Sequence, residues 1–404
     1  IVVRDIRSGK TIAYVGNTDK KWNPATAYVD CANAPRSTGS ILKPLLYYRC
    51  ISSGLITPQS MLLDVPVSYN HFSPQNYSRA YEGLVSAQQA LSKSLNIPMV
   101  ALLNEYGLPT FHNDLKQMGF RHFNKPASHY GLSLILGSGE VTLNELSQVY
   151  GNWAGKLYQP KTSAAEKACI YETLEAMSAL NRPDENGNWK AFINTQKIAW
   201  KTGTSFGNRD AWCVGISPAY VVAVWVGNAD GSGRTGLTGI DCAAPVLFDV
   251  FNALPKNYTW FPRPVKGYQN IVLCRASGYK AGPYCEDKVV TPLPAGASQT
   301  GICPFHHPLQ VNAEETYQVN ASVCDWRLIK QKNYFILPPL AAVYFKSWNP
   351  AFNMPPPWHP DIAEVNHELR IVYPDKTRIL LFGKAEHMDV SFKAVCNEKD
   401  RTIY

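Results

Sequence analysis

The chain has 404 residues, of which 45% are hydrophobic and 17% are charged, and its formal net charge at pH 7 is +8. This composition excludes a disordered chain, and the length allows roughly two or three domains with a sizeable core. The basic residues are spread without a long Lys/Arg block. This distribution argues against a nucleic-acid-binding protein, whereas a mild positive charge suits an anionic polymer.

The first residues are rich in β-forming side chains. Residues 1–6 and 11–15, joined by the turn-forming residues 7–10, predict a β-hairpin. The chain opens on this strand without a methionine, and no apolar run approaches the roughly 18 residues of a membrane span. We therefore expect a fragment whose membrane anchor lies upstream.

A helix is predicted from about residue 40 to residue 53, because residues 39–44 (GSILKP) open an apolar run and Gly54 follows it. Ser37 and Thr38 are candidate N-caps, and Pro44 is acceptable only in the first turn of a helix. The serine at position 40 would then lie at the positive end of the helix.

Ser40 and Lys43 are three residues apart, so they share one face of this helix. A serine hydroxyl attacks poorly until a base takes its proton. A lysine serves as that base when burial or a nearby cation lowers its pKa. Taken alone, the pair is explained more simply as a capped helix with a surface lysine. Two further stretches favour catalysis: residues 94–96 (SLN), after a helical pattern, and residues 201–204 (KTGT), after a strand-like one.

The order of the elements indicates an α+β fold. Residues 57–83 are predicted to form a long surface loop, and loops of that length are usually functional. Helices are predicted at about 85–94, 97–106, 109–118, 142–153, 163–181 and 243–254, and strands at about 196–202, 211–217 and 220–227. Strands, a helical block, three strands and a helix suggest an antiparallel sheet with helices packed on it.

The composition changes after residue 262, where a proline-containing linker begins. We predict three regions: a first domain at 1–262, a small cysteine-rich region at 263–335, and a proline- and aromatic-rich β-type region at 336–404 that is truncated at its end. Residues 336–360 are expected to pack between this tail and the first domain, with a peptide- or glycan-binding surface as the alternative. Residues 368–382 and 390–395 alternate as strands do.

The chain contains ten cysteines, an even number that favours an extracytoplasmic protein. Six side chains of the tail are candidate zinc ligands, but their spacing does not match a Cys-x₂-Cys framework: Cys274, Cys285, Cys303, His306, His307 and Cys324. Disulfides are therefore favoured, with Cys274–Cys285 and Cys303–Cys324 as the local pairings. Free thiols and a metal site remain as alternatives.

The three motifs around residues 40, 94 and 201, in this order, form a set that penicillin-binding proteins and serine β-lactamases share. The chain resembles the transpeptidase domain of bifunctional (class A) penicillin-binding proteins, most closely the 1C type. The resemblance covers roughly residues 1–260 and extends less specifically over the tail. Outside the motifs it rests on residues 76–77 (NY), 81–83 (YEG), 94–98 (SLNIP), 130–137 (YGLSLILG), 209–212 (RDAW) and 243–245 (AAP).

This resemblance implies a serine β-lactamase/transpeptidase-like α+β fold, followed by a cysteine-containing, β-rich C-terminal region. It implies a peptidoglycan D,D-transpeptidase that cross-links stem peptides through a serine acyl-enzyme and is inhibited by β-lactams. A glycosyltransferase domain would precede this chain in a periplasmic protein anchored to the cytoplasmic membrane. Other cell-wall synthesis proteins would bind through the C-terminal region, while no cofactor, metal or nucleic acid is implied.

The resemblance also implies four catalytic residues. Ser40 would attack the carbonyl between the last two D-alanines, and Lys43 would remove its proton. Ser94 would relay a proton to the leaving D-alanine. Lys201 would add positive potential that keeps Lys43 neutral and attracts the substrate carboxylate.

Four further residues would bind substrate. Asn96 would hydrogen-bond the substrate backbone and orient the lysine base, while the hydroxyls of Thr202 and Thr204 would bind the carboxylate. Gly203 would let the strand approach the substrate closely. The backbone N–H groups of Ser40 and Thr204 would form the oxyanion hole.

Other functions fit the same motifs. A D,D-carboxypeptidase or a serine β-lactamase would pass the acyl group to water, and a non-catalytic penicillin-binding sensor or scaffold would keep the motifs without turnover. Asp210 and Trp212 are interpreted as structural. Glu140 is a candidate base for deacylation, but a capping role beside the following helix is the simpler interpretation.

Overall fold

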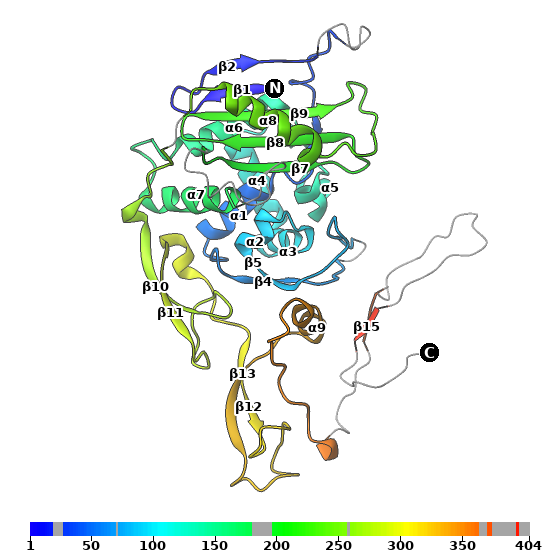
Figure 1. Ribbon diagram of the computed structural model, residues 1–404, viewed down its shortest axis with the longest axis vertical. Coiled ribbons are helices and arrows are strands. Elements are labelled where there is room, and N and C mark those ends of the chain that lie inside the picture. Colours follow the sequence, from blue (N-terminus) through cyan, green and yellow to red (C-terminus); the bar gives the residue numbers. More distant parts are fainter. Residues whose placement is uncertain are drawn as a thin grey trace, which may run out of the picture.

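The computed structural model describes residues 1–18, 27–69, 72–179, 196–256, 259–362, 370–373 and 393–395. A five-stranded antiparallel sheet in the order β2-β1-β9-β8-β7 forms one end of the molecule (Figure 1). Its strands are β1 (Val2–Asp5), β2 (Thr11–Tyr14), β7 (Ala199–Thr204), β8 (Asp210–Ile216) and β9 (Tyr220–Gly227). The predicted N-terminal hairpin and the three later strands are confirmed.

Both faces of the sheet are covered, and the alternation of side chains along each strand explains why. On β9, Val221 and Ala223 join the large core formed with α6 (Leu143–Gly155), whereas Val222 and Val224 join a second core formed with α8 (Ala244–Ala253). A strand buried on both faces is apolar along its whole length rather than alternating, as residues 220–227 are.

The helical block lies on the α6 side of the sheet (Figure 1). It contains α1 (Lys43–Ser52), α2 (Ala87–Ser92), α3 (Asn96–Tyr106), α4 (Leu108–Met118), α5 (Ala127–Tyr130) and α7 (Ala164–Met177). The helices predicted in this block and α8 are confirmed, while α5 and the 3₁₀ helix η1 (Leu132–Leu136) were not predicted. Within the described residues, no helix combines the length and the apolar character that a membrane crossing requires.

The predicted start of the first helix is wrong by three residues. Helix α1 begins at Lys43 with Leu42 as its N-cap, and no side chain caps it. The preceding residues form tight turns, in which the Lys43 N–H donates to Ser40 O at 3.3 Å. Ser37 instead lies in the short strand β3 (Arg36–Ser37), paired with β6 (Glu140–Val141), and its hydroxyl donates to Gly137 O. The Ser37 hydroxyl is therefore used in a tertiary contact and does not cap the helix.

The predicted long loop at 57–83 contains a strand. Strand β4 (Met61–Asp64) pairs antiparallel with β5 (Gly83–Ser86) at the edge of the helical block. Four residues are too few for their alternation to be distinguished from a loop by sequence alone.

The described part of the C-terminal region includes two hairpins and a helix. Strand β10 (Tyr268–Cys274) pairs with β11 (Lys288–Pro294), and β12 (His306–Val311) pairs with β13 (Lys330–Phe335). Helix α9 (Pro339–Trp348) follows in the region predicted to be β-type, and it packs against β5: a Cβ added at Gly83 would lie 2.3 Å from Phe345 N. The packing predicted between the tail and the first domain is thus observed for α9, whose Ala341 and Ala342 cluster with Leu84 and Phe305.

The last described elements are β14 (Arg370–Tyr373) and β15 (Lys393–Val395), which pair antiparallel. The rest of the strands predicted at 368–382 and 390–395 lies outside the described residues, as does Cys396. All nine described cysteines are free thiols, so the disulfides favoured from the sequence are absent from the described part of the chain. Three of these cysteines converge instead on one histidine, because the two hairpins bring distant parts of the chain together.

Candidate active site

The Ser40 turn lies against strand β7, and two glycines make this close approach possible. Gly39 has a φ of +51°, and a Cβ there would lie 2.7 Å from Thr204 N. A Cβ at Gly203 would lie 2.8 Å from Thr38 O and 3.4 Å from Ser40 N. The backbone N–H groups of Ser40 and Thr204 are therefore neighbours at the open edge of the sheet, where β7 pairs with β8 alone.

Lys43 is fully buried at the first turn of α1. Its Nζ donates to Ser94 O at 2.8 Å and to Asn96 Oδ1 at 2.7 Å. Burial lowers the pKa of Lys43 well below its usual value, and the positive charge of Lys201 lowers that pKa further. This environment favours the neutral amine, as the sequence interpretation requires of a base.

Ser94 lies between the two lysines. Its carbonyl oxygen accepts from Lys43, and its Oγ accepts from Lys201 Nζ at 2.8 Å. Ser94 has a φ of +55°, a left-handed conformation that costs a non-glycine residue about 1 kcal/mol or more. Such strain is maintained only where the surrounding contacts fix it, and here two buried lysine side chains do so.

Lys201 comes from β7 and points into the helical side of the sheet. It is 2% exposed, and burial lowers its pKa to about 7. Besides Ser94 Oγ, its Nζ donates to Thr202 O at 2.8 Å. Because the two lysines share one desolvated pocket, protonation of either lysine makes protonation of the other less favourable.

Asn96 connects Lys43 to the long surface loop. Its Nδ2 donates to Gln75 O at 2.7 Å, and its backbone N–H donates to Asn76 Oδ1 at 2.9 Å. Asn76 is 3% exposed, and its Nδ2 donates to Asp64 Oδ1 at 2.8 Å, at the end of β4. Sequence reasoning cited Asn76 only as part of the family resemblance. Asn76 lies in the loop that was expected to be functional, and this location could have indicated that it positions Asn96.

Thr202 and Thr204 lie on the same side of β7, because alternate residues of a strand share a face. Both are partly exposed, whereas Lys201 and Gly203 beside them are buried. Thr204 Oγ1 accepts from the Gly239 N–H at 2.9 Å, which leaves its own proton for another acceptor. The eight predicted site residues are thus contributed by the Ser40 turn, the Ser94 turn, the first residues of α1 and α3, and one edge strand.

The interpretation of Asp210 and Trp212 as structural is consistent with their contacts. Asp210 accepts from Trp225 Nε1 at 3.0 Å and from Ser205 Oγ at 2.7 Å, and Trp212 Nε1 donates to Ser37 O at 2.7 Å. Glu140 is exposed on β6. The capping box of the following helix is formed by Thr142 with Glu145 and does not involve Glu140.

Residues 1–250 match the family described as the penicillin-binding protein transpeptidase domain. The chain belongs to this family. The chain is 34% identical over 280 residues to penicillin-binding protein 1C of Escherichia coli (strain K12), covering 65% of this chain and 36% of that protein. It is 29% identical over 289 residues to penicillin-binding protein 1A of Neisseria cinerea, covering 62% and 35%. The chain therefore spans about a third of the length of the curated relatives it matches.

Solved structures with this fold include class A proteins. The chain is similar to penicillin-binding protein 1A from Haemophilus influenzae, with a TM-score of 0.59 and 18% identity over 75% of this chain and 54% of that chain. It is also similar to PonA1 from Mycobacterium tuberculosis in complex with penicillin V, with a TM-score of 0.53 and 20% identity over 64% and 79%. The predicted α+β fold, an antiparallel sheet packed with helices, is confirmed.

We expect Asn76→Ala to slow penicillin acylation about tenfold, because Asn96 loses the side chain that fixes its backbone and Lys43 loses its positioned acceptor. Acylation rates and the fraction of sites that are finally labelled are measured in parallel. A full labelled fraction with a slow rate indicates mispositioning. A normal rate, or slow labelling of the exposed-residue control Asn270→Ala as well, would contradict the prediction.

Proposed function

We propose that the chain is the D,D-transpeptidase unit of a peptidoglycan synthase, acting through an acyl-enzyme on Ser40. The observation that carries this proposal is the convergence of Lys43 and Lys201 on Ser94, with one 2.8 Å hydrogen bond from each, beside the Ser40 turn. Burial of two lysine amines beside one serine is costly, and such an environment is expected of a site that needs a neutral amine as its base.

In the first step Ser40 Oγ attacks the carbonyl of the penultimate D-alanine, and Lys43 takes the hydroxyl proton. A neutral lysine amine has two N–H groups and one lone pair. Ser94 O and Asn96 Oδ1 accept the two N–H groups, so the lone pair is free to receive the proton of Ser40. The proton then passes through Ser94 Oγ to the leaving D-alanine amine as the C–N bond breaks, and Ser40 becomes the acyl ester.

The negative charge of the tetrahedral intermediate forms on the former carbonyl oxygen. The N–H groups of Ser40 and Thr204 are the proposed donors to it, and their proximity is supported by the two close glycine approaches. The substrate peptide would extend along the open edge of β7. Its terminal carboxylate would accept hydrogen bonds from Thr202 and Thr204 and be attracted by protonated Lys201.

In the second step an amine from a neighbouring stem peptide attacks the ester, forms the cross-linking amide and releases Ser40. A β-lactam presents a similar amide, but its leaving group stays attached after ring opening, so Ser40 would remain acylated. We further propose that the full-length protein carries a glycosyltransferase domain and a membrane anchor upstream of this chain. The anchor would hold the protein on the periplasmic side of the cytoplasmic membrane. Other cell-wall synthesis proteins would bind through the C-terminal region.

The test uses fluorescent penicillin on the whole chain. The labelled peptide is identified by mass spectrometry, the label is followed for hours, and a D-alanyl thioester donor is then supplied with and without a D-amino acid acceptor. We expect a persistent label on Ser40, none on Ser40→Ala, and transfer of the acyl group to the amine.

The alternatives give different results. Rapid loss of the label would indicate a serine β-lactamase, and donor hydrolysis without transfer would indicate a D,D-carboxypeptidase. A persistent label without donor turnover would indicate a sensor. No label on folded protein would indicate a scaffold whose Ser40 is not activated.

A further inference from the structure

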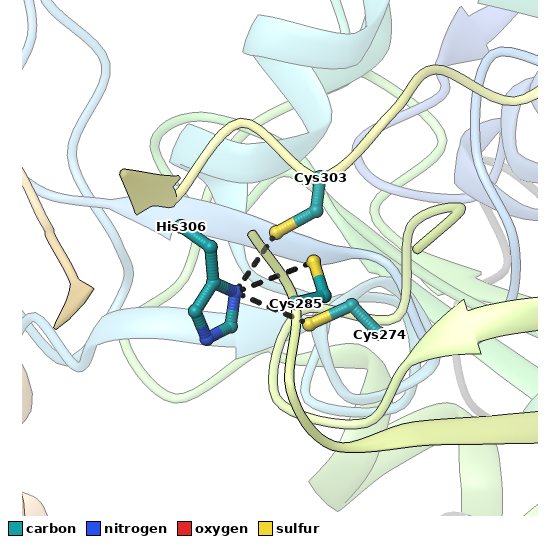
Figure 2. A group of neighbouring side chains, drawn as sticks. All are labelled: Cys274, Cys285, Cys303 and His306. Carbon is teal, nitrogen blue, oxygen red and sulfur yellow. Dashed lines mark hydrogen bonds between the residues drawn. The ribbon is translucent and has the colours of Figure 1, made fainter. Parts of the chain in front are cut away.

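Four side chains from separate parts of the C-terminal region converge on one point (Figure 2). Cys274 ends β10, Cys285 lies in the turn before β11, Cys303 precedes β12, and His306 begins β12. The three sulfur atoms lie 3.4, 3.6 and 3.3 Å from His306 Nδ1, in that order along the chain. All four atoms lie within 4.8 Å of one another.

Hydrogen bonding does not account for this arrangement. A neutral imidazole nitrogen offers either one proton or one lone pair, so Nδ1 satisfies one thiol of the three. A disulfide does not account for it either, since an S–S bond joins two sulfurs and leaves the third thiol and the histidine beside it. The cysteines are 0%, 3% and 8% exposed, so water is largely excluded from the group.

The distances are those of a tetrahedral metal site. With Zn–S bonds of about 2.3 Å and a Zn–N bond of about 2.05 Å, ideal angles separate nitrogen from sulfur by about 3.6 Å and two sulfurs by about 3.8 Å. The observed N···S distances of 3.3–3.6 Å agree with this value. Three thiolates and one imidazole in a closed tetrahedron are the ligands that Zn²⁺ prefers in structural sites.

The surrounding backbone supports thiolate ligands. The Gly282 N–H donates to Cys285 Sγ at 3.3 Å, as expected of a turn that holds a metal-bound sulfur. The sequence also contains a signal that a Cys-x₂-Cys pattern misses: residues 303–306 (CPFH) are a Cys-x₂-His step. We propose that Cys274, Cys285, Cys303 and His306 bind one structural Zn²⁺ ion.

The ion would supply cohesion that the local core lacks. The small apolar cluster between the two hairpins and α9 contains Leu84, Phe305, Leu337, Ala341 and Ala342 besides the three cysteines. A cluster this small stabilises a region weakly, and structural metals commonly supply the remainder. The zinc would join hairpin β10–β11 to hairpin β12–β13 through ligands from both.

The same site would fasten the tail to the transpeptidase domain. The segment after Cys274 is bonded to the start of β4: Met61 N donates to Ser277 O at 2.8 Å, and Thr57 Oγ1 donates to Gly278 O at 2.7 Å. Helix α9, which follows β13, packs on β5. Metal binding would therefore stabilise two contacts between the tail and the β4–β5 pair: the hydrogen bonds at the start of β4 and the packing of α9 on β5. This inference does not depend on the proposed acyl transfer.

The test uses the whole chain without a histidine tag, isolated from the periplasm and dialysed against metal-free buffer. We expect about one zinc per chain by elemental analysis. Replacing zinc with Co²⁺ should give the intense visible bands of a tetrahedral site together with thiolate-to-cobalt charge transfer. Removing the metal with a strong chelator should lower the melting temperature and expose the tail to proteolysis.

Two matched pairs of variants separate ligands from bystanders. Cys285→Ser and His306→Ala should lower the zinc content at least tenfold, whereas Cys324→Ser and His307→Ala, from the same region, should keep it. Wild-type protein without zinc, iron in place of zinc, or a disulfide among Cys274, Cys285 and Cys303 would each overturn the proposal. So would His306→Ala protein that retains zinc and the cobalt spectrum. The wild-type results decide the matter even where a ligand variant fails to fold.

Discussion

Replacement of Lys43 by methionine is expected to slow penicillin acylation about a thousandfold, within the range for loss of a positioned general base. Methionine fills the same buried space without a basic nitrogen to take the Ser40 proton, so packing is largely kept while the base is removed. The second-order rate constant is measured with fluorescent penicillin. Lys197→Met, which removes a surface lysine paired with Glu175, is the matched control and should acylate normally.

The pH dependence of acylation tests the same assignment through Lys201. As the pH falls, Lys43 takes up a proton and the rate falls, which gives the acidic limb of the profile. The charge of Lys201 disfavours protonated Lys43 and so lowers its pKa. In Lys201→Met this repulsion is lost, the pKa of Lys43 rises, and the acidic limb moves to higher pH.

The alkaline limb should disappear in the same variant. Burial lowers the pKa of Lys201 to about 7, so wild-type protein loses its positive potential as the pH rises through that value. Burial is the larger cause for Lys43, whose pKa therefore stays below its usual value in Lys201→Met. An acidic limb that does not move, or moves to lower pH, would show that Lys43 is not the base.

The candidate catalytic side chains were chosen from the sequence because the chemistry proposed for them restricts residue type and order. Ser40 and Lys43 are three residues apart along the chain, and the motifs at 94 and 201 rarely follow such a pair by chance. The convergence of the two lysines on Ser94 is a long-range contact, and it followed from the family resemblance rather than from spacing.

Other features depended on contacts that no local pattern encodes. Helix α1 begins at Lys43 because β7 and β6 hold the preceding turn, although Ser37 is a good cap by composition. Helix α9 begins at Pro339, within the region predicted to be β-type, and proline is well suited to the first turn of a helix. The four members of the sulfur cluster were among the candidate zinc ligands, but disulfides were favoured over a metal site because the cysteine spacing contains no Cys-x₂-Cys step.

The second large effect is expected from Gly203→Ala. The added methyl group would lie 2.8 Å from Thr38 O and 3.4 Å from Ser40 N, and both are backbone atoms that cannot rotate away. Strand β7 must then move from the Ser40 turn, which separates the two N–H groups of the proposed oxyanion hole. Loss of one such donor costs about 10²–10³ in rate, so acylation should slow about a hundredfold or more.

A second glycine of the same sheet distinguishes this effect from instability. On β8, a Cβ at Gly215 would lie 2.7 Å from Phe251 Cε2 and 2.9 Å from Leu247 Cδ2, both side-chain atoms of α8. Gly215→Ala should therefore destabilise the fold by about 1–3 kcal/mol through overpacking, with acylation near normal below the melting temperature. Acylation rates and thermal unfolding of both variants are compared. If Gly203→Ala acylates as fast as Gly215→Ala at equal stability, the N–H groups of Ser40 and Thr204 do not form the oxyanion hole.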